Sequence, residues 1–119
     1  MRGIVVSGAK VHTSCTPNVD ETWIWDGVDW TLAAPTNTPG GLARYGMAFD
    51  MLRNRLVLFG GIQNVYQAST ISGATWEFDG ATWSSSASGS PGPRENVAMC
   101  YSLALGKTVL FGGSGPPLV

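Results

Sequence analysis

Charged side chains are scarce in this sequence: they make up 13% of its 119 residues, with seven Lys or Arg and eight Asp or Glu. The basic residues are scattered along the chain, and the formal net charge is −1. Binding to nucleic acid or to an anionic membrane needs clustered Lys and Arg side chains that neutralise phosphate groups. The composition therefore argues against both partners.

Cysteine and histidine are also rare, with two cysteines and one histidine. Cys15 and Cys100 could pair, but two cysteines do not make a disulfide scaffold. Cys100 lies within an apolar strand pattern, where we expect a small core residue. His12 alone cannot supply the two or three imidazoles of a histidine metal site. We expect no metal and no other cofactor.

The sequence contains no long apolar run. The first apolar segment, Ile4 to Val6, ends at Ser7, which is far too short for a signal-peptide core or a membrane span. We therefore expect a soluble chain without a signal peptide or transmembrane segment, and the sequence does not indicate its compartment. Sixteen glycines, seven prolines and five tryptophans are typical of a turn-rich, all-β protein.

Internal repetition is the strongest signal in the sequence. Residues 22–27 (TWIWDG) return as residues 75–80 (TWEFDG), an interval of 53 residues. Residues 56–61 (LVLFGG) return as residues 108–113 (TVLFGG), an interval of 52. The missing residue falls in a stretch of Ala, Pro, Thr and Asn that is typical of a loop, where length changes are tolerated. A period of about fifty residues indicates a stacked repeat architecture.

A partial third copy opens the chain. Residues 2–8 align with residues 55–61 at the same interval of 53, with Ser7 in place of the first glycine of the pair. We interpret the chain as one repeat unit, residues 1–119. Its copies are residues 1–38 (partial), 39–90 (full) and 91–119 (partial).

Each copy contains several segments with strand signals. The runs 56–59 and 109–111 are short, apolar at every position and closed by Gly-Gly, which predicts strands buried on both faces. The Asp-Gly pairs at 26–27 and 79–80 separate aromatic-rich segments, and Asp-Gly is favoured where both turn residues of a hairpin need positive φ. The expected strands are 4–6, 22–25, 28–32, 44–50, 56–59, 75–78, 81–85, 96–102 and 108–111.

These motifs resemble bacterial kelch repeats over nearly the whole chain. The shared features are the paired glycines after a short apolar strand, the aromatic hairpin with Asp-Gly, and a tryptophan three residues beyond that glycine, Trp30 and Trp83. Kelch repeats have a period of about fifty residues and form β-propeller blades of four antiparallel strands. The resemblance implies an all-β chain with about two kelch-like blades. Ser7 and Ser102 depart from the repeated pattern.

The resemblance also implies that the propeller is incomplete. Lettered outward from the axis, the chain supplies strands B-C-D, then A-B-C-D, then A-B. Because a blade cannot bury its faces alone, we expect copies to associate until a ring closes, with a homotrimer of about six blades preferred. Segments 4–6 and 108–111 both fit the B position of one blade, and the intact Gly112-Gly113 favours the second. The residues expected in self-assembly are Trp23, Trp25, Trp30, Met99, Val109 and Phe111.

No residue set for catalysis emerges. The serines at 84–86 lack a G-x-S-x-G elbow, Cys100 lacks an activating base, and residues 112–115 lack the lysine of a phosphate loop. A copper oxidase that acts on galactose has a kelch-like architecture, but its tyrosine, histidine and crosslinked cysteine ligands have no counterpart here. We predict that the chain is not an enzyme.

Two loops differ in sequence while their flanking strands agree, residues 9–20 and 62–73, and both would join strand B to strand C. Rigid scaffolds often carry binding residues on such loops. The candidate contacts to a protein or carbohydrate ligand are Lys10, His12, Gln63, Asn64 and Tyr66. The equally weighted alternative is that these loops are only long connections.

Three functional hypotheses follow. The leading one is a non-catalytic binding or assembly module that completes a propeller with copies of itself and binds a ligand through these loops. The main alternative is a truncated fragment of a larger secreted kelch-type protein, which could act on carbohydrate through residues outside this chain. The third is an assembly unit without a ligand. The mass of the native particle separates the first from the second.

Overall fold

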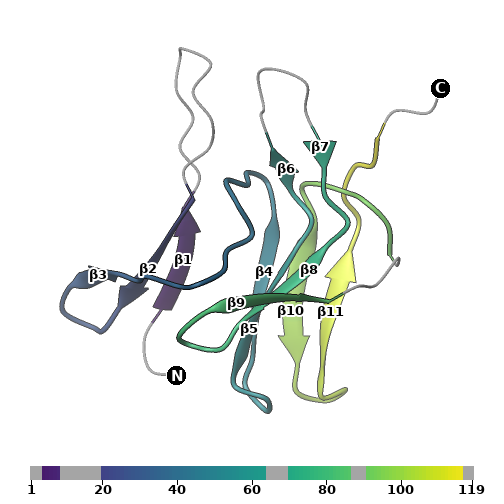
Figure 1. Ribbon diagram of the computed structural model, residues 1–119. Coiled ribbons are helices and arrows are strands. Elements are labelled where there is room, and N and C mark those ends of the chain that lie inside the picture. The colour runs from purple at the N-terminus through teal and green to yellow at the C-terminus, as the bar shows by residue number, and fades with distance from the viewer. Residues whose placement is uncertain (1–3, 9–19, 64–69, 87–90, 117–119) are drawn as a thin grey trace.

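In the computed structural model, the described residues are 4–8 (backbone only), 20–63, 70–86 and 91–116. All regular structure in these residues is β-strand, which confirms the all-β prediction (Figure 1). None of the described residues belongs to a helix able to cross a membrane. The strands are β1 (Ile4–Gly8), β2 (Glu21–Trp25), β3 (Trp30–Leu32), β4 (Gly46–Asp50), β5 (Arg55–Phe59), β6 (Ile62–Gln63), β7 (Thr70–Ile71), β8 (Thr75–Phe78), β9 (Trp83–Ser86), β10 (Ala98–Ser102) and β11 (Lys107–Phe111).

The centre of the molecule is a four-stranded antiparallel sheet in the order β4-β5-β8-β9. Every residue of β5 after Arg55 is buried, as the apolar run predicted. The sheet is twisted, so that β9 runs horizontally in Figure 1 while β4 runs vertically. This sheet contains the four strands of the full repeat copy.

Two smaller antiparallel sheets flank the central one. The three-stranded sheet β1-β2-β3 lies on one side and the hairpin β10-β11 on the other, where β10 packs against β4 (Figure 1). These pairings follow the strand order expected for the two partial copies. A fourth sheet, the short ribbon β6-β7, was not expected and extends from the end of β5.

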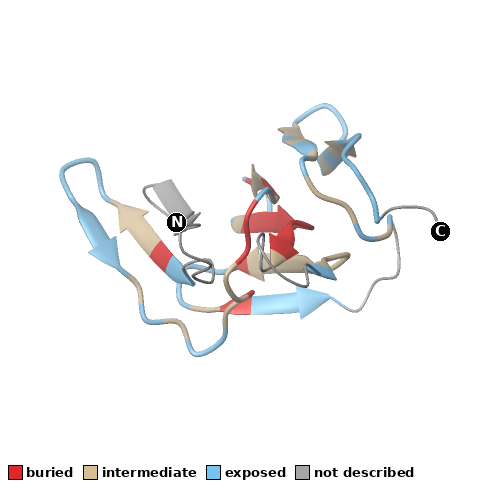
Figure 2. Cartoon of the chain, turned by 90° about the horizontal axis from the view of Figure 1, so that it is seen from above, coloured by how far each residue is buried: buried red, intermediate tan, exposed pale blue. Residues whose placement is uncertain are grey.

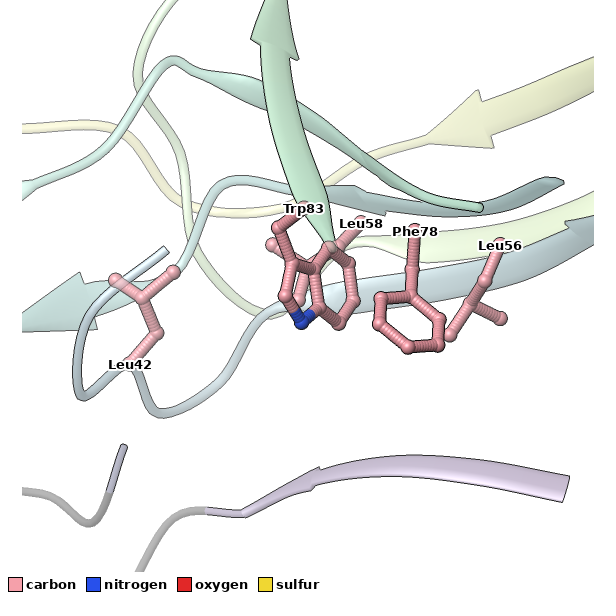
Figure 3. Close-up of a cluster of buried hydrophobic side chains, with 5 residues drawn as sticks. All are labelled: Leu42, Leu56, Leu58, Phe78 and Trp83. Atoms are coloured by element: carbon pink, nitrogen blue, oxygen red, sulfur yellow. The ribbon is translucent and has the colours of Figure 1, made fainter. Parts of the chain in front are cut away.

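The hydrophobic core covers one face of the central sheet. Leu58, Phe78 and Trp83 are the largest fully buried side chains, and Leu42 and Leu56 complete the cluster (Figure 3). Burying each such side chain contributes about 1.5–3 kcal/mol. Ile24 of β2 packs against this cluster, so the core joins the first sheet to the second. Figure 2 shows the buried residues gathered at the centre, with the outer strands mostly intermediate or exposed.

A buried hydrogen bond fixes the first sheet to the second. The indole Nε1 of Trp83 in β9 donates to Thr22 Oγ1 in β2 over 2.9 Å. Both residues are almost fully buried. A buried indole N–H without a partner carries a desolvation cost, so this bond fixes the position of β2 as well as satisfying the donor.

The Asp-Gly turns form by a different mechanism from the one expected. Gly80 has a positive φ of 104°, but Asp79 does not have positive φ. Instead, Asp79 Oδ1 accepts hydrogen bonds from the backbone N–H groups of Ala81 (2.8 Å) and Thr82 (2.9 Å). The turn at residues 26–29 has the same arrangement. Aspartate is required here for its side-chain oxygen, because short acidic side chains can close a turn onto the following backbone.

Candidate self-association surface

The same repeat position is buried in one copy and exposed in the other. Phe59 of β5 is 2% exposed, whereas Phe111, the equivalent residue of β11, is 81% exposed. The prediction that the second apolar run is buried on both faces is therefore wrong for the single chain. The reason is structural: β5 lies between β4 and β8, but among the described strands β11 pairs only with β10.

The hairpin β10-β11 nevertheless has the geometry of the equivalent hairpin in the central sheet. Ala98 pairs with Phe111, as Gly46 pairs with Phe59 one copy earlier. The register of β10-β11 thus matches that of β4-β5, the first two strands of the central sheet. Within the described part of the chain, no strand pairs with the other edge of β11, and an open strand edge is a template on which another strand can form.

The turn of this hairpin repeats as well. The backbone N–H of Leu105 donates to Ser102 Oγ over 3.2 Å. One copy earlier, the backbone N–H of Arg53 donates to Asp50 Oδ1 over 3.0 Å. Local side-chain hydrogen bonds thus close the turn in both hairpins.

The hairpin β2-β3 corresponds to β8-β9, the last two strands of the central sheet. Trp25 pairs with Trp30, as Phe78 pairs with Trp83 in the central sheet. The ring centroids of the first pair are 5.3 Å apart and those of the second pair 5.0 Å. Yet Trp30 is 41% exposed and Trp83 only 1%. Among the described residues, Trp30 therefore lacks the cover that Trp83 has.

The structure distributes the expected self-assembly residues over two environments. Trp30, Val109 and Phe111 are exposed. Trp23 and Trp25 are half-buried, and Trp23 Nε1 donates to Glu21 Oε2 over 2.7 Å. These two therefore already have partners within β2 and β3.

Met99 and Cys100 lie on opposite faces of β10. Met99 packs within the chain against Gly46 of β4. Cys100, which the sequence pattern suggested as a core residue, is a free and exposed cysteine in the single chain. Among the described residues, no sheet lies against the face of β10 that carries Cys100, and this explains its exposure.

An ion-pair network, which the sequence pattern did not indicate, joins the turn between β4 and β5 to β8. Arg53 binds both Asp50, through Nε at 2.7 Å from Oδ2, and Glu77. Hydrogen bonds from the Arg53 backbone and then from its side chain lower the pKa of Asp50 below its ordinary value. The two carboxylates in turn raise the pKa of Arg53. This network spans the turn, β4 and β8, so it depends on the presence of the third strand.

Among the candidate ligand contacts, only Gln63 lies within the described residues. It is half-buried in β6, paired with Thr70 of β7. Lys10, His12, Asn64 and Tyr66 lie outside the described residues. The described residues contain no group of three or more His, Cys, Asp or Glu side chains arranged to hold a metal ion.

No protein family model and no curated protein matches the chain. The resemblance to kelch repeats thus remains a prediction from the motifs.

Proposed function

We propose that this protein is a non-catalytic assembly module whose copies complete one another's sheets. In this proposal, β11 of one copy pairs with the β2-β3 hairpin of the next, and the order β10-β11-β2-β3 reproduces β4-β5-β8-β9. Repetition of the contact closes a kelch-like β-propeller. Head-to-tail contacts of this kind form a ring when the rotation between copies closes.

The observation that carries this proposal is the contrast between Phe59, 2% exposed, and Phe111, 81% exposed, at one repeat position. The central sheet supplies the template, because it contains both halves and buries the phenylalanine. Covering an exposed phenylalanine contributes about 1.5–3 kcal/mol, and the pairing of an open strand edge adds backbone hydrogen bonds.

The tryptophan of the outer half supports the same arrangement. Trp83 donates to Thr22 of the preceding sheet. The equivalent residues one copy away are Trp30 and Thr75, and both side-chain types are kept. In a ring, Trp30 of the next copy would lie over β8 and could donate to Thr75 Oγ1. In the ring, the exposed indole of Trp30 would therefore be buried against β8 and would have a hydrogen-bond acceptor.

The number of copies follows from the number of sheets. Each chain provides one complete four-stranded sheet and the two halves of another. Propellers have about four to eight blades, so two, three or four chains could close one, and three chains giving about six blades is the count we propose.

Native mass spectrometry, supported by light scattering, tests the proposal. We expect a single discrete particle of three chain masses, while two or four chain masses would keep the mechanism and change the count. A folded monomer over the whole accessible concentration range would overturn the proposal. Heterogeneous aggregates that dissolve only when missing repeats are supplied would instead favour the alternative, a fragment of a larger kelch-type protein.

A further inference from the structure

The strand β1 pairs with β2 in a register that differs from the rest of the repeat. In the central sheet, Leu58 of β5 pairs with Trp76 of β8. Moved back by the repeat interval of 53 residues, this pair becomes Val5 and Trp23. The structure instead pairs Val5 with Ile24, a shift of one residue.

The other sheets keep the repeat register. Trp23 pairs with Leu32 in β2-β3, as Trp76 pairs with Ser85 in β8-β9. The pairing of β10 with β11 likewise matches that of β4 with β5. β1 therefore occupies the place beside β2 without reproducing the template.

The strand β11 fits that place in the template register. Applying the β5-β8 pairing to β11 and to β2 of a second copy brings Val109 opposite Ile24 and Leu110 opposite Trp23. It also leaves Phe111 opposite Thr22. The pairs Val57–Glu77, Leu58–Trp76 and Phe59–Thr75 occupy these positions in the central sheet.

One change of residue types between the copies identifies the second chain as the occupant. Arg53 forms an ion pair with Glu77 across β5 and β8. The equivalent residues are Leu105 in the β10-β11 turn and Ile24 in β2, so both charged partners are replaced by apolar ones. Leu105 is exposed in the single chain. If β11 pairs with β2 of another copy, Leu105 lies near the apolar Ile24. If β11 instead took the place of β5 beside β8, the carboxylate of Glu77 would lose the cation of Arg53.

The residues around Ile24 are also less polar than those around Glu77, the equivalent position in the central sheet. Desolvation, followed by the negative charge of Asp50, raises the pKa of Tyr101, so this phenol lies beside the charged site. The residue at the same position one copy earlier is Phe49, which has no hydroxyl. Phe49 and Ile24 pack against the same buried cluster. Ile24 and Phe49 thus offer apolar side chains to an occupant that carries Leu105.

A second pair of residues keeps its charges. The positive charge of Arg55 contributes to the lowered pKa of Asp79, after the hydrogen bonds that Asp79 accepts from the backbone of Thr82 and Ala81. The equivalent residues are Lys107 on β11 and Asp26 after β2, which again carry opposite charges. Pairing of β11 with β2 of another copy would bring these two charges together. Complementary charge favours this register over shifted ones.

We infer that β1 is a removable occupant of the edge of β2 and that β11 of a second copy displaces it when the ring forms. This inference rests on the proposed self-association. It adds the strand edge at which two copies meet, the register of their pairing and the displacement of β1 as a step that controls assembly. The unassembled chain covers the β2 edge with its own N-terminal strand. Assembly then exchanges this pairing for the template pairing.

A reversible crosslink tests the exchange. In a chain with Cys15→Ser and Cys100→Ser, Val5→Cys with Ile24→Cys joins backbone partners of β1 and β2. Once oxidised, this lock should hold β1 in place and raise the protein concentration needed for assembly by about tenfold or more. Reduction of the same sample should restore assembly. If the oxidised, crosslinked protein assembles like the reduced protein, the inference is overturned and the proposed self-association stands.

A second pair of variants tests the register. In the same background, Ile24→Cys with Val109→Cys should crosslink different chains on mild oxidation. The control, Ile24→Cys with Leu110→Cys, is shifted by one residue and should crosslink at least about fivefold less, since neighbouring residues point to opposite faces of a strand. Equal crosslinking in both would overturn the register. If neither the reduced variants nor the unmodified chain assembles, the proposed function itself fails.

Discussion

Gly46 of β4 lies against Met99 of β10 so closely that a methyl group on Gly46 would come within 2.6 Å of the Met99 sulfur. The same methyl group would lie 2.5 Å from a Val97 methyl carbon. The backbone of Gly46 does not have positive φ, so glycine is needed here for its small size. This contact sets the spacing between the central sheet and the C-terminal hairpin.

The first prediction follows from this spacing. Gly46→Ala should destabilise the protein by about 1–3 kcal/mol, because a tightly packed contact cannot accept a methyl group without shifting β10. Urea unfolding at one protein concentration measures the change. Val97→Ala and Met99→Ala in the same chain remove both close contacts, so the losses should be less than additive. An unchanged midpoint for Gly46→Ala would contradict the close packing of the two strands.

The second prediction concerns the bond between Trp83 and Thr22. Thr22→Val keeps the shape of the side chain but removes the acceptor for a buried indole N–H, which should cost about 1–3 kcal/mol. The control is Thr31→Val on the exposed strand β3, where we expect a change within about 0.5 kcal/mol. Chemical denaturation of both variants measures the two changes in the free energy of unfolding. Equal midpoints would show that the bond contributes nothing.

The strands could be predicted because their signals are local and repeated. Paired glycines end β5 and follow β11, and an Asp-Gly turn divides each aromatic hairpin, so two copies confirm each boundary. The ribbon β6-β7 could not be predicted in this way. Its strands have two residues each, and they lie in a loop whose sequence is not repeated.

Burial could not be predicted from the same pattern, because it depends on neighbours that a sequence segment does not contain. Val57 and Val109 have the same residue type in equivalent strands, but of the strands that the structure describes, a third one lies only beside that of Val57. The Arg53–Glu77 pair is another example, since it joins a turn to a strand more than twenty residues away. Sequence repetition gave the positions of equivalent residues, and the sheets determined which of them have partners.

The third prediction concerns acid stability. Hydrogen bonds from the backbone of Thr82 and then of Ala81 to its carboxylate lower the pKa of Asp79 below its ordinary value of 3.8. A group whose pKa is lower in the folded state stabilises that state above the unfolded pKa, and this contribution is lost as the pH falls through the folded pKa. Stability should therefore decrease below about pH 4.

Asp79→Asn separates this effect from other titrations. Asparagine keeps a side-chain oxygen that can accept the turn hydrogen bonds, but it does not titrate. Thermal unfolding between about pH 2 and 6 should show a weaker dependence on pH for the variant than for the unmodified chain. Asp79→Ala, which removes the acceptor, should be less stable at all of these pH values. Parallel pH profiles for the unmodified and Asn chains would contradict the role of the carboxylate.

The last prediction compares two phenylalanines at one repeat position. Phe59→Ala removes a buried ring and should destabilise the fold by about 3–5 kcal/mol. Phe111→Ala removes an exposed ring, so the unfolding of the monomer at low concentration should change by less than about 0.5 kcal/mol. If copies associate through β11, the same variant should weaken assembly by about 1.5–3 kcal/mol per contact, an increase in dissociation constant of more than about tenfold.

The measurement for Phe111→Ala combines denaturant unfolding with analytical ultracentrifugation over a range of concentrations. A matched control is Val28→Ala, which also removes an exposed apolar side chain but lies in the β2-β3 turn, away from the edge of β11. It should assemble like the unmodified chain. If Phe111→Ala and Val28→Ala assemble alike, the exposure of Phe111 has no part in self-association, and the edge of β11 is not the contact between copies.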